Sequence, residues 1–447
     1  MTLNGDPPVD QWVREFQSKG LTRRQFTFRL LAAGLSIPAA AAFIEACSGG
    51  SSTTNGAVTL QFMKFQNDND DKAIMKALDR WNQANKDIQV KFVTVPFGDY
   101  LGAKLTTAFA AGTGPDIFWM SPGNFLSYVS NGIAAPLDDV VADVKSDYLD
   151  AAIKAVSVNG KVYSLPFEME PVALYYRKDI LSAAGVTPPT TWDELMAASK
   201  KLTTANRSGV MIETAQNPYQ NFTWYPFLWS AGGEVINPDW TASALRTDAA
   251  ASAFDIWGQL VKRGYAPKKT AAITADAGPL GRGETAMQVC GFWAIAQLKA
   301  GFPDLQYGVV KLPAPAGKSS TTVYGGWTHM VSAKSKYVAQ AKKFSKWLWA
   351  QDQTFPHDWA CVTNTKFSPR NTVNTSCSTE FGTPPKDFFT SQVLPTARAE
   401  PRYPDQIVKA VGDGIQAALF TDKSGQQAAA VAADAIDSFL KTYKGAH

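Results

Sequence analysis

The chain has 447 residues, of which 45% are hydrophobic, so it can bury a large core and form two or three domain-sized units. Its 43 basic and 39 acidic residues nearly balance, without a long run of either sign. This composition indicates a globular protein and gives no reason to expect a nucleic-acid partner.

The N-terminal segment has the order of features found in an export signal. Residues 22–28 read TRRQFTF, and the small-residue apolar segment LLAAGLSIPAAAAFIEAC then runs to Cys47. An arginine pair before such a segment is typical of the twin-arginine route. The segment is shorter than the roughly 20 apolar residues of a membrane-spanning helix. We expect residues 1–46 to be this signal; the alternative is an amphipathic N-terminal helix of a cytosolic protein.

Residues 47–56, CSGGSSTTNG, predict a flexible linker. Ala46 directly before Cys47, with Ile44 three positions before it, resembles the lipid-attachment site of bacterial lipoproteins, although Glu45 departs from that pattern. We expect a lipid on Cys47 to anchor the protein at the outer face of the cytoplasmic membrane. Cleavage near the alanines would instead release it into the periplasm or the extracellular space.

The other three cysteines fit an exported protein. Cys361 and Cys377 lie 16 positions apart in a segment rich in Pro, Thr, Asn and Ser, where an oxidising compartment would permit a disulfide. Cys290, within AMQVCGFW, is more simply a small buried hydrophobic residue.

From residue 57 the sequence alternates between strand and helix patterns. Strands are predicted at 58–65, 88–96 and 115–120, and helices at 71–85 and 100–112. A second series runs from LPFEMEPVALYYRKDIL through TTWDELMAASKKLT to ETAMQVCGFWAI, and helices are predicted at 335–352 and 425–443. This rhythm predicts parallel strands joined by helical crossovers, in two α/β lobes.

Motifs for cofactor or metal chemistry are absent from the sequence. The three histidines, His329, His357 and His447, do not form a helical zinc motif, and no phosphate-binding or dinucleotide-binding glycine loop occurs. We therefore expect neither a metal nor a cofactor such as ATP or NAD.

Two further features could carry function. In FEMEP, Glu168 and Glu170 would lie on one side of a strand, about 6.5 Å apart. They could be the acid and base of a glycosidase, acceptors for sugar hydroxyls, or part of a solvated strand. Thirteen tryptophans, several in turn-rich surroundings such as NFTWYPFLWSAGG and GGWTHM, could include aromatic ligand platforms, although a single Trp is more often core.

Four stretches together resemble the carbohydrate-binding proteins of ABC importers, the group that contains maltose-binding protein. In chain order these are GPDIFWMSPGNFLSYVSNGIAAPLDD, YSLPFEMEPVALYYRKDILSAAGVTPPTTWDEL, GRGETAMQVCGFWA and GGWTHMVSAKSKYVAQAKKFSKWL. The resemblance covers essentially the whole mature chain. It departs at PGN, which replaces charged residues of maltose-type sites and disfavours maltose itself.

The resemblance implies two discontinuous α/β lobes joined by hinge segments, with the ligand in the cleft between them. The implied crossings lie near 166–172, 309–314 and 363–370. The N-terminal lobe would comprise 57–168 and 313–365, and the C-terminal lobe 169–312 and 366–447. The protein would be a monomer that binds a sugar without reacting with it and delivers it to permease subunits.

The resemblance also implies ligand-binding residues that combine aromatic rings with polar side chains. Positions matching family motifs are Gln66, Asn67, Asp68, Trp119, Asn124, Glu170 and Trp293. We add Glu168 from the carboxylate pair, and, by their neighbourhood, Trp224, Trp327, Arg402 and Tyr403. Because Gly291 suits a strand end, we assign Phe292 to packing and Trp293 to the cleft.

Two alternatives stay open at this point. A polyamine receptor of similar architecture would direct Asp68, Glu168 and Glu170 at ammonium groups. A secreted glycosidase would use Glu168 and Glu170 as its acid and base. The absence of a second carboxylate constellation disfavours the enzyme.

Overall fold

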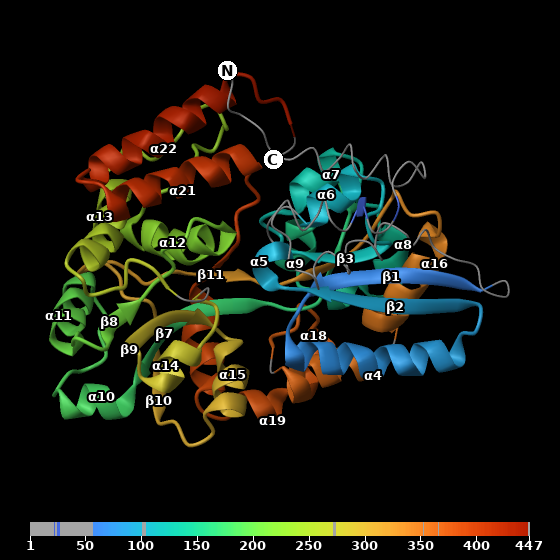
Figure 1. Ribbon diagram of the computed structural model, residues 1–447, viewed down its shortest axis with the longest axis horizontal. Coiled ribbons are helices and arrows are strands. Elements are labelled where there is room, and N and C mark those ends of the chain that lie inside the picture. The colour runs from blue at the N-terminus through green and yellow to red at the C-terminus, as the bar shows by residue number, and fades with distance from the viewer. Residues whose placement is uncertain are drawn as a thin grey trace.

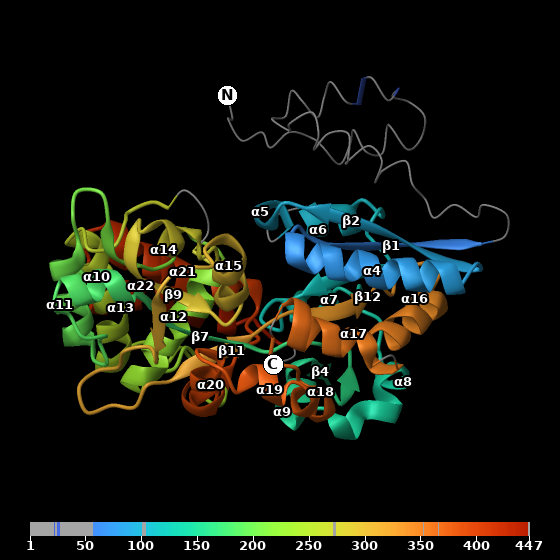
Figure 2. The same cartoon turned by 90° about the horizontal axis from the view of Figure 1, so that it is seen from below.

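The computed structural model describes Thr22, Gln25, Phe26 and residues 57–100, 104–270, 274–351, 353–364 and 366–445 (Figure 1). Apart from the first three of these, the predicted signal (1–46) and linker (47–56), with Cys47, lie outside the described residues. Within the described part of the chain, no helix combines the length and apolar character needed to cross a membrane. Two α/β lobes lie side by side (Figures 1 and 2).

The first lobe is built on a five-stranded sheet of order β2-β1-β3-β12-β6. Its strands are β1 (Val58–Phe65), β2 (Ile88–Val95), β3 (Ile117–Met120), β6 (Leu165–Pro166) and β12 (Thr328–Val331). A separate hairpin joins β4 (Ser157–Val158) to β5 (Lys161–Val162). The helices of this lobe are α4 (Asp68–Ala84), α5 (Phe97–Asp99), α6 (Leu105–Ala110), α7 (Phe125–Ser130), α8 (Asp138–Val141), α9 (Asp150–Ala155), α16 (Val338–Ser345) and α17 (Thr354–His357).

The second lobe contains a sheet of order β13-β11-β7-β9-β8, with β10 also paired to β7. Its strands are β7 (Glu170–Arg177), β8 (Ser208–Met211), β9 (Thr285–Gly291), β10 (Tyr307–Val310), β11 (Thr322–Gly325) and β13 (Ala397–Ala399). Its helices are α10 (Lys178–Ala183), α11 (Trp192–Leu202), α12 (Pro218–Ala231), α13 (Asp248–Lys262), α14 (Gly278–Arg282), α15 (Ala294–Gly301), α21 (Asp405–Phe420) and α22 (Gly425–Leu440). Between α17 and β13 lie α18 (Asn371–Ser376), α19 (Ser378–Phe381) and α20 (Lys386–Phe388).

Strand β7 shows why this second sheet is buried on both faces. Alternate side chains of a strand point to opposite faces. Val172 and Leu174 pack in the core formed with α12, α13, α21 and α22. Ala173 and Tyr175 pack on the other face, against residues of α14, α15 and the segment from 360 to 394. A continuous apolar run such as PVALYY is therefore required here.

The chain crosses between the lobes at places that differ in part from those expected. The first crossing, between β6 and β7, lies where it was predicted. The second was expected at 309–314, and this expectation is wrong: β11 still pairs with β7 in the second sheet, so the chain crosses between Gly325 and Thr328. Residues 313–325 therefore belong with the second lobe. Gly326 has a φ of +124°, and a Cβ there would lie 2.6 Å from the Glu168 carbonyl oxygen, so this crossing needs glycine.

Strand direction follows from these crossings. The predicted parallel pairing is correct for β1 with β2 and with β3, but wrong for β12, which runs antiparallel to β3. A strand arriving from the other lobe starts at the cleft edge, where β1 and β3 end, and must run the opposite way. For the same reason β7 is antiparallel to β9 and β11. The carboxyl ends of β1, β3, β9 and β11 consequently converge on the space between the lobes.

Candidate ligand-binding cleft

A cavity of about 340 Å³ lies where these strand ends meet. Its lining comes from both lobes, mainly from residues that follow β1, β3, β9, β11 and β13. Ligands in open α/β sheets collect at this edge, beyond the carboxyl ends of strands. The lining residues are Phe65, Gln66, Asn67, Asp70, Phe97, Ser121, Asn124, Glu170, Pro218, Tyr219, Phe222, Ala275, Asp276, Trp293, Gln297, Gly326, Trp327, Lys366 and Glu400.

The first-lobe wall is positioned by the start of α4. The Asn67 side chain caps this helix by accepting hydrogen bonds from the backbone N–H groups of Asn69 and Asp70, each at 3.2 Å. This cap holds the turn after β1, so Gln66 and Asn67 face the cavity. On the neighbouring strand end, Asn124 Nδ2 donates to Ser121 Oγ at 3.2 Å, and both residues line the cavity.

Trp293 forms part of the opposite wall. Its ring folds back over Gly291, where a Cβ would overlap it, so only glycine permits this ring position. Nε1 donates to the Ala275 carbonyl oxygen at 2.7 Å, and the ring meets Tyr219 edge to face at 6.0 Å. Phe292, by contrast, is fully buried and stacks on Phe367. Adjacent aromatic residues thus have different surroundings: Phe292 is core, and Trp293 lines the cavity.

Trp327 closes the cavity from the second crossing. Its ring lies 4.5 Å from that of Phe65, centroid to centroid, and its backbone N–H donates to Glu168 Oε1 at 3.1 Å. Trp327 and Phe65 both line the cavity. The aromatic rings of the cleft therefore belong to both lobes and to a crossing between them.

A buried charge cluster underlies the cavity. Lys366 Nζ lies 2.8 Å from Glu170 Oε1 and 3.4 Å from Glu168 Oε2. Burial raises the pKa of both Glu168 and Glu170, while the Lys366 charge acts in the opposite direction. Burial alone would lower the pKa of Lys366, but the surrounding carboxylates outweigh it and raise that pKa, so this lysine stays charged.

A second buried lysine supports the first-lobe side of the cleft. Lys64 is fully buried, and its Nζ lies 2.7 Å from Asp71 Oδ1 and 3.4 Å from Asp70 Oδ2. Asp70 also lines the cavity. Partly buried polar groups drawn from both lobes, together with flat aromatic faces, can hold a polar ligand that has an apolar side.

The profile of the family described as bacterial extracellular solute-binding protein matches residues 65–354. The chain belongs to this family. Among its relatives are a binding protein of Brucella abortus, 29% identical over 367 residues (79% of this chain and 86% of the relative), and the galactooligosaccharide-binding protein of Bacillus subtilis, 26% identical over 332 residues (71% and 75%).

Solved structures share the fold of this solute-binding protein. An ABC transporter solute-binding protein of Thermotoga lettingae, bound with α-D-tagatose, aligns with a TM-score of 0.78 at 21% identity, covering 86% of this chain and 99% of the other. The GacH receptor of Streptomyces glaucescens, solved unliganded and with acarbose, aligns with a TM-score of 0.75 at 24% identity and the same coverages. These likenesses confirm the predicted architecture of two discontinuous α/β lobes joined by hinge segments.

Half of the twelve predicted ligand-binding residues of this solute-binding protein lie at the cavity: Gln66, Asn67, Asn124, Glu170, Trp293 and Trp327. Three others lie close to it but do not line it. Glu168 is buried behind Glu170 and accepts a hydrogen bond from Trp359 Nε1 at 3.1 Å. Asp68 is exposed on the first turn of α4, and Trp119 is fully buried, with Nε1 donating to His329 Nδ1.

The other three predicted residues serve packing or contacts between segments. Trp224 is fully buried, and its Nε1 donates to the Ala253 carbonyl oxygen at 3.2 Å. Arg402 Nη1 donates to the carbonyl oxygens of Ser157 and Lys154, at 2.6 and 3.2 Å. The Tyr403 ring packs against Tyr225 and Trp240. These three residues were predicted because polar or turn residues surround them in the sequence. That proximity does not determine the direction in which a side chain points.

Sequence reasoning missed several lining residues. Lys366 and Glu400 follow segments without a family motif, and β13, which positions Glu400, has only three residues. Tyr219 and Phe222 lie near the start of α12, where nearly every side chain is buried and no helical face stands out. Asp70 could have been found, because it lies in the capped first turn directly after β1.

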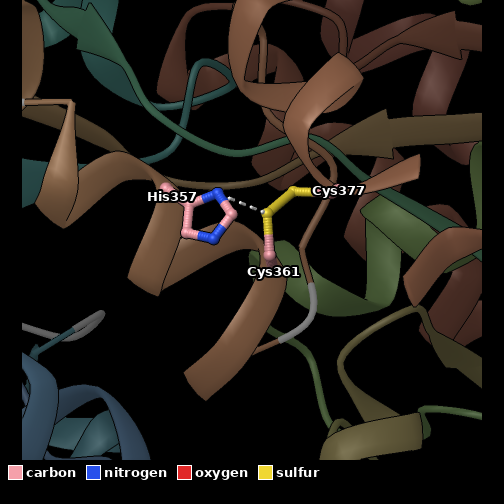
Figure 3. Close-up of side chains that lie close together, drawn as sticks. All are labelled: His357, Cys361 and Cys377. Atoms are coloured by element: carbon pink, nitrogen blue, oxygen red, sulfur yellow. Dashed lines mark hydrogen bonds between the residues drawn. A yellow bond between two sulfur atoms is a disulfide. The ribbon is translucent and has the colours of Figure 1, made fainter. Parts of the chain in front are cut away.

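None of the three cysteines among the described residues lines the cavity. Cys361 and Cys377 form a disulfide, and His357 Nδ1 lies 3.2 Å from Cys361 Sγ (Figure 3). These three side chains are close enough together to suggest a metal site, but both sulfurs are committed to the disulfide. Cys290 is a buried free thiol whose pKa is raised to about 12 by burial, so it is unreactive at neutral pH.

Proposed function

We propose that this solute-binding protein captures a sugar or oligosaccharide between its lobes and delivers it to the permease subunits of an ABC transporter. The observation that carries the proposal is the cavity at the strand ends, where Trp293, Trp327 and Tyr219 stand beside carboxylates and amides. Relatives named for galactooligosaccharide, diacetylchitobiose and arabinooligosaccharide binding support this ligand class.

The chemistry of a sugar matches this lining. A pyranose has apolar C–H faces that cover an aromatic ring, and hydroxyl groups that form charge-assisted hydrogen bonds with carboxylates. Closing the two lobes would exclude water and strengthen those hydrogen bonds. The residues that we propose as ligand contacts from the original prediction are Gln66, Asn67, Asn124, Glu170, Trp293 and Trp327.

The buried charge cluster gives no support to the glycosidase alternative. A general acid or base must come within hydrogen-bonding reach of the scissile bond. Glu168 does not line the cavity, and its carboxylate is engaged by Trp327 N–H, Trp359 Nε1 and Lys366. We therefore propose that the protein binds its ligand without catalysing a reaction. We also propose that it acts as a monomer.

A ligand screen tests the proposal. The purified mature protein should melt at higher temperature with one or more members of a panel of mono- and oligosaccharides, since a ligand at about 100 times its dissociation constant stabilises by about 2.7 kcal/mol. Small-angle scattering with the same sugar should give a smaller radius of gyration, because the hinge segments allow the lobes to close. Stabilisation by polyamines, with no response to any sugar, would overturn the sugar proposal.

We also propose export by the twin-arginine route and lipid attachment at Cys47. In a host that lipidates proteins, Cys47→Ala should move the mature protein from the membrane fraction to the soluble fraction, because the variant lacks the thiol to which the lipid anchor is attached. A matched Ser48→Ala variant should stay with the membrane. Equal membrane retention of Cys47→Ala and the natural protein would contradict lipidation.

A further inference from the structure

Carboxylates face the cavity from three directions. Asp70 belongs to the first lobe, Glu170 to the first crossing, and Asp276 and Glu400 to the second lobe. Of the described residues that line the cavity, Lys366 is the one cation. The charge of the cleft therefore depends on whether Lys366 is free to balance these groups.

Lys366 is already committed to its own neighbours. Its Nζ bridges Glu170 and Glu168, at 2.8 and 3.4 Å. Lys64, the other buried lysine beside the cleft, pairs with Asp71 and Asp70. These two lysines are thus paired with four carboxyl groups, two for each lysine. The net charge of the six side chains stays negative even if one of the carboxyl groups holds a proton.

Two carboxyl groups of the second lobe also face the cavity, Glu400 and Asp276. The Glu400 carboxylate lies against Gly123 of the first lobe, and burial raises its pKa to about 7. No lysine or arginine of the described residues is among the groups that shift the pKa of Glu400. Asp276 lies near Arg282, but Arg282 forms its ion pair with Glu284, Nε to Oε1, at 2.6 Å.

Closing the lobes brings these carboxyl groups together in a space from which water is excluded, and a cation bound among them would favour the ionised form of Glu400. A neutral sugar would leave their repulsion in place, whereas a protonated amine would cancel part of it and could also lie against the faces of Trp293 and Trp327. We propose that the ligand is a sugar carrying a protonated amine, bound between Asp70 and Glu170 on one side and Glu400 on the other. This inference rests on the proposed sugar-binding function.

Matched sugar pairs test the inference by calorimetry. At about pH 6.5, where sugar amines are largely protonated, the probes are glucosamine, galactosamine and mannosamine, each with its neutral parent, and the β-1,4-linked glucosamine disaccharide with its N-acetylated form and cellobiose. At least one amine should bind about 10- to 100-fold more tightly than its neutral and acetylated partners. That advantage should shrink between about 20 and 300 mM salt, as screening weakens charge pairs.

Isosteric variants test which carboxylates cause the preference for the amine. Glu400→Gln and Asp70→Asn should each weaken binding of the amine about 10-fold more than binding of its neutral parent, because the amide retains shape and hydrogen-bonding capacity but loses the charge that pairs with the amine. Asp422→Asn, an exposed second-lobe carboxylate, should change neither affinity. Melting temperatures measured without ligand establish that each variant is folded.

The outcomes separate this inference from the proposed function. Binding of neutral sugars as tightly as their amines, or an amine preference unaffected by Glu400→Gln and Asp70→Asn, would overturn the inference and leave sugar binding intact. Binding of spermidine with no response to any sugar would overturn both.

Discussion

Lys366→Met should lower the free energy of unfolding by about 3–5 kcal/mol, because it leaves buried carboxylates without their shared cation. Lys366 Nζ lies between Glu170 and Glu168, and all three residues are buried. Met fills a similar volume, so the loss reflects charge rather than a cavity. Chemical denaturation of the ligand-free protein measures it.

The pH dependence of this effect has a definite sign. Burial already raises the pKa of Glu168 and Glu170, and removing Lys366 should raise both further. A carboxyl group whose pKa is raised on folding binds protons more tightly in the folded state, so stability falls as pH rises above its unfolded value of about 4.3. The Lys366→Met penalty should therefore be small in acid and grow towards neutral pH.

Two controls isolate the charge cluster. Lys318→Met, at an exposed position, should change stability by no more than about 0.5 kcal/mol. Adding Glu170→Gln to Lys366→Met should recover part of the loss, because one uncompensated charge is removed. A Lys366→Met penalty that is equal at acid and neutral pH would show that packing, not charge, was lost.

The sequence predicted the regular elements with strong local patterns and missed features set by packing between distant segments. Strand β1 was predicted at its observed bounds, because its alternating pattern is followed at once by a helix cap. The second crossing was misplaced because β11 has only four residues and follows the Pro- and Gly-rich segment 312–317. Only its pairing with β7 assigns β11 to the second lobe.

In the cleft, too, residues with a strong local pattern could be predicted, and residues placed by contacts between distant segments could not. Asn67, Asn124 and Trp293 directly follow strands or close turns that carry family motifs, so their places could be predicted. Trp119 lies within β3, where the direction of its side chain depends on contacts with His329 and Trp359 from distant parts of the chain. Periodicity in β3 cannot reveal this, because every residue of that strand is buried.

Trp293→Ala should weaken sugar binding by about 2–4 kcal/mol, or roughly 30- to 1000-fold in Kd, because it removes an aromatic face from the cavity wall. Its cost in folding should be smaller, about 1–2 kcal/mol, since the ring is only partly buried and loses one hydrogen bond, to Ala275. Calorimetry with the sugar identified by the screen gives the affinity, and thermal melting gives the stability.

Its neighbour provides a matched control for Trp293. Phe292 is fully buried against Phe367, so Phe292→Ala should cost about 3–5 kcal/mol of stability while affinity per folded molecule stays nearly unchanged. Gly291→Ala changes the same cavity wall without removing Trp293. The added Cβ would displace the Trp293 ring, so this variant should also weaken sugar binding. If Trp293→Ala lowers the melting temperature as much as Phe292→Ala and leaves affinity unchanged, then Trp293 is part of the core and the ligand lies elsewhere in the cleft.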